Sequence, residues 1–455
     1  METSNEIFIF LGLMCILLAG AIQQMIPSPP ATCVGIDLGT TYSCVAVFED
    51  GEITVINNAE RMAITASVLF VPQRNASDVV VGDRARAAAA REAGTLVYDA
   101  KRFIGKPYDA EAAAREGRGL PFALVPGRSE ARAQWEAHLE VRADGQRVRL
   151  APEHVGAMII HALKREAEKY VGRTVENVVL AVPVGFSAKQ INATREAAVL
   201  AGFTVLRTIH EPTAAAMAYG LHTAAQVSTV MVYDMGGGTL DVSLLNLNNG
   251  IFEVMAAAGD NRLGGQDFNL AVLDAIVSRV KAKLPSYALE EDAEAMRALR
   301  EEAERLKLEL NDECDCGGDF DAADEGGSFA VEVQLAPSLR GAAPIFLSRR
   351  EYEELAAPLF ERAILPVAKV LSTVGMRRDE VDEVVLVGGS TRMAYVRRML
   401  REYFGGRYPN CDVSPEEAVA HGTAIQAAIL TDRKKISVGA TEAALHQHIE
   451  GSVER

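Results

Sequence analysis

The stretches Val34-Gly35-Ile36-Asp37-Leu38-Gly39-Thr40-Thr41-Tyr42 and Val232-Tyr233-Asp234-Met235-Gly236-Gly237-Gly238-Thr239-Leu240-Asp241 share one pattern. In each, an apolar run typical of a buried strand ends in an aspartate, turns through glycine and threonine, and continues into a second strand. We expect the second strands to run from Cys44 to Phe48 and from Val242 to Leu247. One structural device therefore occurs twice, about two hundred residues apart.

The repeated pattern suits phosphate binding beside a metal ion. Glycines let the backbone approach a ligand closely and turn successive N–H groups toward a phosphate, and threonine hydroxyls add donors. The aspartate at each strand end, Asp37 or Asp234, offers a carboxylate that suits hydrated magnesium. Taken alone, either aspartate is more often a turn cap. The repetition of the whole pattern favours a two-sided site.

A third glycine-containing stretch follows a strand predicted from Val384 to Val387 and leads into a helix predicted from Met393 to Phe404. Between them, Gly388 to Arg392 would direct free N–H groups and a helix dipole at a phosphate or a nucleotide sugar. By contrast, Lys101 alone resembles a solvated helix lysine, and Glu211 alone resembles an acid that favours a helix start.

Length and composition indicate a globular chain with two lobes. The 455 residues exceed one ordinary domain, and 49% of them are apolar. Helix and strand patterns alternate, which predicts α/β sheets with covering helices. The net charge of −16 argues against nucleic acid and anionic membranes as main partners. The sequence contains no P-loop, no Rossmann fingerprint and no Gly-x-Ser-x-Gly elbow.

An apolar run from Ile7 to Ile22 predicts a secretory signal peptide over residues 1–21, cut after Ala21. The preceding residues carry Glu2 and Glu6 instead of the usual positive charge. A retained membrane anchor is therefore the alternative.

Together these stretches resemble the nucleotide-binding domain of the seventy-kilodalton heat-shock chaperones, within the actin and sugar-kinase superfamily. The resemblance runs from Val34 to Leu430, and its motifs appear in the family's order. They are 35–43, 99–102, 211–216, 234–241, 263–265 and 386–392. The resemblance implies an actin-like ATPase fold, with two lobes that each hold a ribonuclease-H-like mixed five-stranded sheet and an accessory subdomain.

The resemblance also implies a role for each site residue, with ATP or ADP and Mg²⁺ as ligands. Asp37 and Asp234 would hold the magnesium water shell. Lys101 would position the attacking water, Glu211 and Asp241 would assist the metal and the water, and Thr239 would complete the catalytic set. The β- and γ-phosphates would be clamped by Gly39, Thr40, Thr41, Tyr42, Gly236, Gly237, Gly238 and Thr239. The adenosine would be held by Glu304, Lys307, Gly388, Gly389, Ser390 and Arg392.

Four positions depart from the family's pattern, one of them Gln266, which replaces a usual glutamate before Asp267. Leu308 stands where the family usually has an arginine that stacks on adenine, and Glu416 stands where it usually has aspartate, which implies weaker adenine binding. Ile191 replaces an arginine that, with the proline matching Pro183, relays the nucleotide state to a peptide-binding domain.

The predicted division of the chain is lobe I over 32–222, lobe II over 223–411, a helix returning to lobe I over 412–431, and a polar tail over 432–455. The chaperones continue beyond the residue matching Leu430 into a peptide-binding domain. We therefore expect a monomeric member without a stable site for client peptides, resembling microsome-associated members of the family. Its place would be the lumen of the endoplasmic reticulum, and co-chaperones or nucleotide-exchange factors would bind its lobes.

Three functions remain open at this point. The first is a peptide-independent Mg-ATPase that assists protein processing, in which bound nucleotide sets lobe closure. The second is a nucleotide-dependent scaffold with negligible hydrolysis, and the third is a small-molecule kinase of the same superfamily.

Overall fold

The computed structural model describes residues 32–431 except 50, 76, 118–119, 130–133, 222–226, 249 and 312–328. The predicted signal at 1–21 and the tail at 432–455 lie outside the described residues. No helix in the described part of the chain is both long and apolar enough to cross a membrane.

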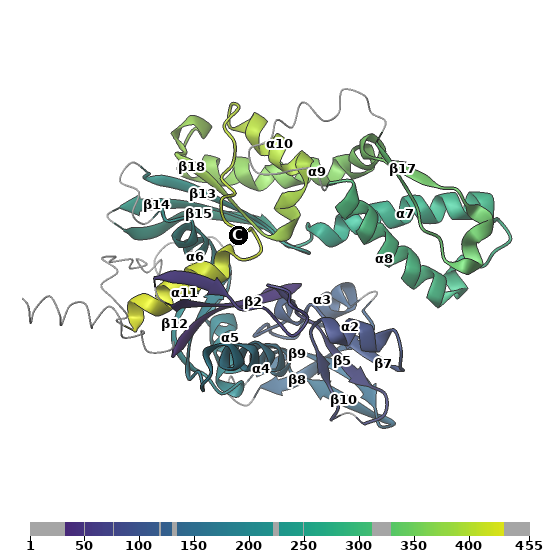
Figure 1. The fold of residues 1–455 in the computed structure, drawn as a ribbon, viewed down its shortest axis with the longest axis horizontal. Coiled ribbons are helices and arrows are strands. Elements are labelled where there is room, and N and C mark those ends of the chain that lie inside the picture. The colour runs from purple at the N-terminus through teal and green to yellow at the C-terminus, as the bar shows by residue number, and fades with distance from the viewer. Residues whose placement is uncertain are drawn as a thin grey trace, which may run out of the picture.

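Two sheets face each other across the molecule (Figure 1). The β1 sheet has the order β12 (Thr204–His210), β11 (Asn177–Val182), β1 (Cys33–Asp37), β2 (Tyr42–Glu49) and β3 (Glu52–Val55), with β4 (Thr65–Ala66) paired to β2. The β13 sheet has the order β15 (Ile251–Asp260), β14 (Leu240–Asn248), β13 (Thr229–Met235) and β18 (Glu383–Val387). Each sheet mixes parallel and antiparallel pairs. The mixed α/β class and the actin-like fold are confirmed.

The β13 sheet has four strands, and its fifth place is held by a single parallel bridge between Val385 and Asn410. The amide of Leu386 donates to the Asn410 carbonyl at 3.1 Å, and the Asn410 amide donates to Val384 at 2.7 Å.

Further elements accompany each sheet, and we call each sheet with these elements a half (Figure 1). The β1 half adds β5 (Leu69–Pro72), β6 (Val80–Val81), α2 (Asp83–Ala89), β7 (Gly94–Val97), α3 (Ala110–Glu116), β8 (Ala123–Ser129), β9 (Gln134–Ala143), β10 (Gln146–Leu150), α4 (Pro152–Val171) and α5 (Ala188–Leu200). The β13 half adds α7 (Gly265–Lys283), α8 (Ala293–Glu309), β16 (Ala330–Glu332), β17 (Phe346–Ser348), α9 (Arg349–Val374) and α10 (Ala394–Tyr403). Strand β7, helix α3 and the β8–β9–β10 sheet were not predicted from the sequence.

Two helices of small residues lie between the sheets, α6 (Glu211–Ala218) and α11 (Ala418–Leu430). One apolar core joins β11, α6, β13, β18 and α11. Helix α11 approaches so closely that a Cβ on Gly422 would lie 1.7 Å from the Ala214 carbonyl oxygen of α6. Within the predicted range 412–431, α11 begins only at Ala418, and the amides of Glu417 and Ala418 both donate to the Ser414 carbonyl in a turn that precedes it.

The second strand of each hairpin begins two residues earlier than expected, β2 at Tyr42 instead of Cys44 and β14 at Leu240 instead of Val242. Helix α11 packs on β1, β2 and β11, although it follows the β13 half in sequence. The lobe boundaries at 222, 411 and 431 stay predictions.

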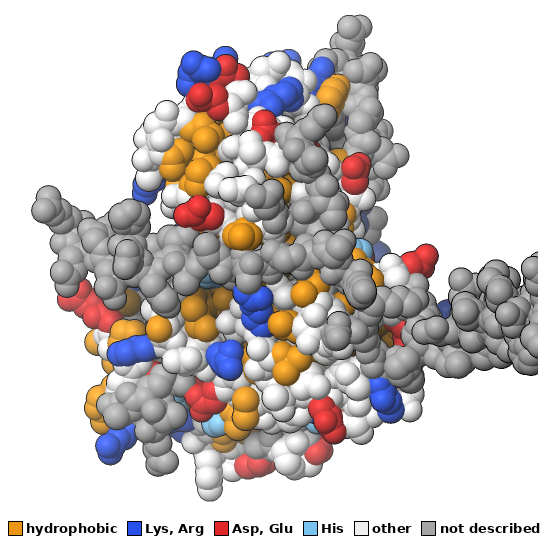
Figure 2. Space-filling view, turned by 90° about the vertical axis from the view of Figure 1, so that its left-hand side faces the viewer, with side chains coloured by type: hydrophobic (Ala, Val, Ile, Leu, Met, Phe, Trp, Pro, Cys, Tyr) orange, Lys and Arg blue, Asp and Glu red, His pale blue; other side chains and the backbone are white. Residues whose placement is uncertain are grey.

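Acidic and basic side chains are interspersed over both halves on the face shown in Figure 2, with small apolar patches between them. The net negative charge is therefore not gathered into one acidic area on this face.

Replacing Gly422 with alanine should separate α6 from α11. The added methyl group overlaps the Ala214 carbonyl, and overpacking of this kind costs about 1–3 kcal/mol. The free energy of unfolding in urea should fall by that amount. Gly185→Ala is the matched control, because its Cβ would meet no atom within 4 Å. Equal losses in both variants would contradict the close helix contact.

Candidate functional site

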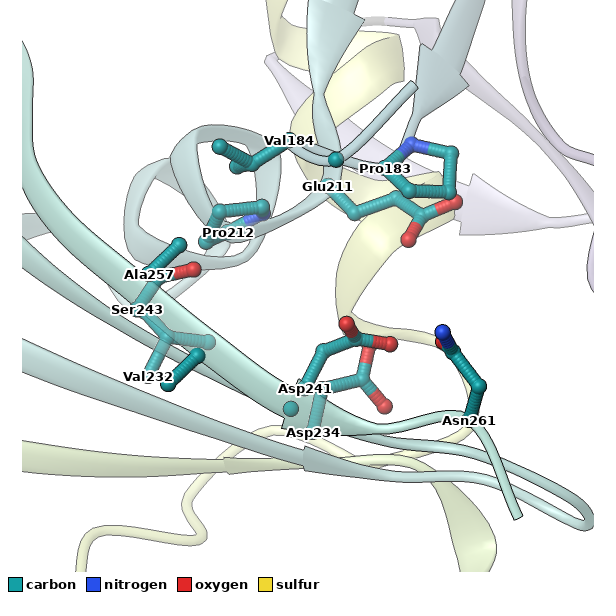
Figure 3. A pocket seen from close by; sticks show the side chains of 13 residues that line it. Pro183, Val184, Glu211, Pro212, Val232, Asp234, Asp241, Ser243, Ala257 and Asn261 are labelled. Atoms are coloured by element: carbon teal, nitrogen blue, oxygen red, sulfur yellow. The ribbon is translucent and has the colours of Figure 1, made fainter. Parts of the chain in front are cut away.

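The two hairpins bring their aspartates to the space between the halves. Asp37 ends β1, while Asp234 near the end of β13 and Asp241 near the start of β14 are direct partners in the antiparallel register. Figure 3 shows the carboxylates of Asp234 and Asp241 side by side, with Glu211 facing them across the pocket. Glu211 is the first residue of α6, and Lys101 lies in a single 3₁₀ turn, Ala100–Arg102.

Lys101 and Glu211 form a buried ion pair, with 2.7 Å between Nζ and Oε1. Each side chain is 11% exposed. Burial alone would lower the pKa of Lys101, but the charges of Glu211 and Asp37 outweigh it and raise the pKa. The lysine is therefore held charged and oriented, which excludes the alternative of a solvated helix lysine.

Asp37 and Asp234 are half-buried, Asp241 is exposed to the space between the halves, and one cation, Lys101, lies close to all three. Desolvation between the halves raises the pKa of Asp37 to about 7 and that of Asp241 to about 6, and it raises the pKa of Asp234 well above its ordinary range. The charge of Lys101 opposes all three shifts, while Glu211 adds to them. Desolvated carboxylates of this kind are stabilised by an added cation.

This donor set fits the implied magnesium ion. Carboxylate oxygens suit Mg²⁺, which usually keeps several of its waters. In the described part of the chain, no three acidic, histidine or cysteine side chains are placed to hold a bare ion directly. A water-bridged ion between Asp37 and Asp234 stays a prediction.

A cavity of about 240 Å³ opens beside these carboxylates. Its polar wall includes Glu211, Asp234, Asp241 and Asn261, and its apolar wall comes from α6 and the β13 sheet. Pro183 also lines it. The cavity places space for a small substrate or a water molecule next to the charged groups.

The glycine turns of the two hairpins lie against each other between the halves. Thr41 Oγ1 is buried without a hydrogen-bond partner and lies against Gly237. The second turn is closed by the Gly236 amide, which donates to the Thr239 carbonyl at 3.0 Å. The first turn is equally tight, because a Cβ on Gly39 would lie 1.9 Å from the Tyr42 carbonyl oxygen. Thr40 and Thr239 are half-buried.

The residues predicted to hold adenosine gather beside the second turn. Ser390 Oγ donates to the Gly236 carbonyl at 2.8 Å, and the Lys307 ammonium lies near Gly265, where burial lowers its pKa. Glu304 is half-buried on the same helix as Lys307. Leu308 is 60% exposed.

The guanidinium of Arg392 is already bonded to other side chains of the protein at the predicted adenosine site. Its guanidinium pairs with both carboxylate oxygens of Glu416, at 2.5 to 3.1 Å, and reaches Ser414 Oγ at 3.3 Å. The Glu416 carboxylate also lies beside Gly389. The residue at position 416 therefore fixes the arginine beside the Gly388–Gly389 turn.

Three residues at the site were not assigned a role from the sequence, namely Asp99, Arg102 and Asn261. Arg102 donates to the carbonyls of Gly238 and Asn261, both in the β13 half. Asp99 and Arg102 belong to the motif 99–102, which also contains Lys101. That motif could be recognised in the sequence, but the contacts of Arg102 with the β13 half could not.

Two facing α/β halves, joined by central helices and each presenting an aspartate and a glycine turn, define an actin-like ATPase fold. The chain belongs to the Hsp70 family, because the family model described as Hsp70 protein matches residues 33–439.

A curated relative supports this assignment. The chain is 40% identical over 408 residues to a protein named Heat shock 70 kDa protein BIP3 from Oryza sativa subsp. japonica. The match covers 89% of this chain and 58% of that protein, so the chain spans less than two thirds of the relative's length.

The raised pKa values predict how stability depends on pH. A carboxyl whose pKa is raised on folding stabilises the fold while it is protonated, and this stability is lost as the pH rises through the folded pKa. Asp37→Asn should therefore gain stability over the parent protein between pH 4 and pH 7, by at least about 1 kcal/mol. Urea unfolding without nucleotide or magnesium measures this.

Asp274→Asn, which changes an exposed carboxylate on α7, is the matched control. A stability difference for Asp37→Asn that stays constant over this pH range would contradict the raised pKa.

Proposed function

We propose that this Hsp70-family chain binds ATP with magnesium between its halves and hydrolyses it to ADP and phosphate. The observation that carries the proposal is the buried Lys101–Glu211 pair facing Asp37, Asp234 and Asp241 between two touching glycine turns. Phosphoryl transfer needs positioning and charge stabilisation more than covalent chemistry. This arrangement offers both.

The glycine turns would bind the β- and γ-phosphates through their backbone N–H groups and threonine hydroxyls. The unpartnered Thr41 hydroxyl supports this, because a buried donor without an acceptor favours a ligand oxygen. Asp37 and Asp234 would hold magnesium through its waters, and the ion when bound would supply charge to the phosphate oxygens.

Lys101 would act on the attacking water and on the γ-phosphate. Its ammonium is held by Glu211, so it would need little reorganisation as negative charge develops. With its pKa raised to about 6, Asp241 is mostly ionised at neutral pH and would accept a hydrogen bond from the water.

Two further features of the proposal concern coupling and place in the cell. Ile191 is a half-buried apolar residue where the resemblance expects an arginine, which supports turnover independent of peptide. The apolar run from Ile7 to Ile22 supports the endoplasmic reticulum or microsomes as the place of action. Binding of co-chaperones or exchange factors by the halves belongs to the same proposal.

One observation favours the scaffold alternative. Leu308 presents an exposed apolar side chain where a stacking cation would strengthen adenine binding. A chain that binds nucleotide weakly and turns it over negligibly would serve as a binding platform only.

Lys101→Ala should lower the rate of phosphate release from Mg-ATP by at least about 100-fold, because a preorganised charge at the phosphate is lost. Binding of ADP should persist, and unfolded peptide should leave the parent rate unchanged. Lys189→Ala, which removes an exposed lysine of α5, is the matched control.

Phosphate release by the parent protein no faster than by Lys101→Ala would contradict the enzyme and favour the scaffold. Phosphate transfer to a small acceptor instead of water would favour the kinase.

Leu308→Arg should tighten ADP binding several-fold, on the order of 1 kcal/mol for a cation stacked on an aromatic base. Calorimetry of ADP binding to both proteins measures the change. Leu270→Arg adds the same charge at an exposed position of α7 and is the control. Equal affinity for Leu308→Arg and the parent would place adenine away from α8.

A further inference from the structure

Arg102 joins the two halves beside the phosphate turns. Its Nη2 donates to the Gly238 carbonyl at 3.0 Å and its Nη1 to the Asn261 carbonyl at 2.8 Å. On the β1 half, its Nε pairs with Asp99 Oδ2 at 3.1 Å. One guanidinium therefore uses three of its donors on three groups in two halves of the molecule.

The β1 end of this connection is held at a conformational cost. Asp99 has a φ of 58°, in the left-handed region that residues other than glycine seldom adopt. It is also 9% exposed, and burial raises the pKa of its carboxyl. Strain of this kind persists where surrounding contacts require it, and the ion pair with Arg102 is such a contact.

The β13 end is shaped to receive the guanidinium. A Cβ on Gly238 would lie 1.8 Å from Arg102 Nη2, so a side chain at this position would displace the arginine. The segment carrying Asn261 is itself fixed, because Arg362 of α9 binds Asp260 Oδ2 at 2.7 Å and the Arg262 carbonyl at 2.9 Å. Arg102 thus binds a rigid acceptor pair.

We propose that Asp99, Arg102, Gly238 and Asn261 form a latch that holds the phosphate turns closed on bound nucleotide and delays the release of ADP. The latch rests on the proposed function. Arg102 directly follows Lys101, so the latch also fixes the distance between Lys101 and the turn from Gly236 to Thr239. Arg102 is a positioning residue in this scheme, since it acts through Lys101 and the turn.

The experiment measures the dissociation of N-methylanthraniloyl-ADP with Mg²⁺ and the rate of a single turnover of ATP. Arg102→Ala removes two charge-assisted hydrogen bonds across the cleft, so ADP should dissociate about tenfold faster. The single turnover should slow, because Lys101 is no longer held at a fixed distance from the turn between Gly236 and Thr239. Opposite changes in these two rates distinguish a latch from a general loss of folded protein.

Two further variants make the test specific. Asp99→Asn keeps the size of the side chain and tolerates the left-handed backbone, while it removes the charge that orients Arg102. It should accelerate ADP release in the same direction. Arg84→Ala breaks a surface ion pair with Glu60 in the same half and should leave both rates unchanged.

Unchanged ADP dissociation in a folded Arg102→Ala protein, with ADP bound normally by the parent, would overturn the latch alone. Failure of the parent protein to bind ADP would overturn both the latch and the proposed function.

Discussion

Four carboxylates converge between the halves, and among the described residues Lys101 is the cation whose charge acts on all of them. Desolvation makes this imbalance expensive, because charges removed from water require partners. The raised pKa values of the three aspartates express this cost, and a cation bound there would relieve it. Active sites commonly carry such perturbed groups, since preorganised charge is what they supply to the reaction.

The spacing of these charges depends on packing at a distance from them. Helices α6 and α11 meet through glycine and alanine, and their shared core connects β11 of one sheet with β13 and β18 of the other. Because α6 also begins with Glu211, the same helix sets both the separation of the sheets and the position of the partner of Lys101. A change in the packing of α6 would therefore also move Glu211 relative to Lys101.

The sequence predicted the parts of this structure that are local. The hairpins could be recognised because strand, aspartate and glycine turn are adjacent in the chain, and they occur where expected. Lys101 looked solvated because its burial comes from residues more than a hundred positions away. Arg102 lies in a recognised motif, but its contacts had no local signal, since its acceptors are backbone carbonyls of distant segments. In β9, the alternation of apolar and polar residues from His138 to Ala143 is a strand signal that the sequence does carry, although β9 was not predicted.

The most direct measurement is the affinity for ADP by calorimetry with Mg²⁺ and with EDTA, for the parent protein and for Asp37→Asn/Asp234→Asn. If these carboxylates hold the ion through its waters, ADP should bind the parent at least about tenfold more tightly with Mg²⁺, and the double variant should lose this difference. Equal affinity of the parent under both conditions would contradict the central role of the carboxylates.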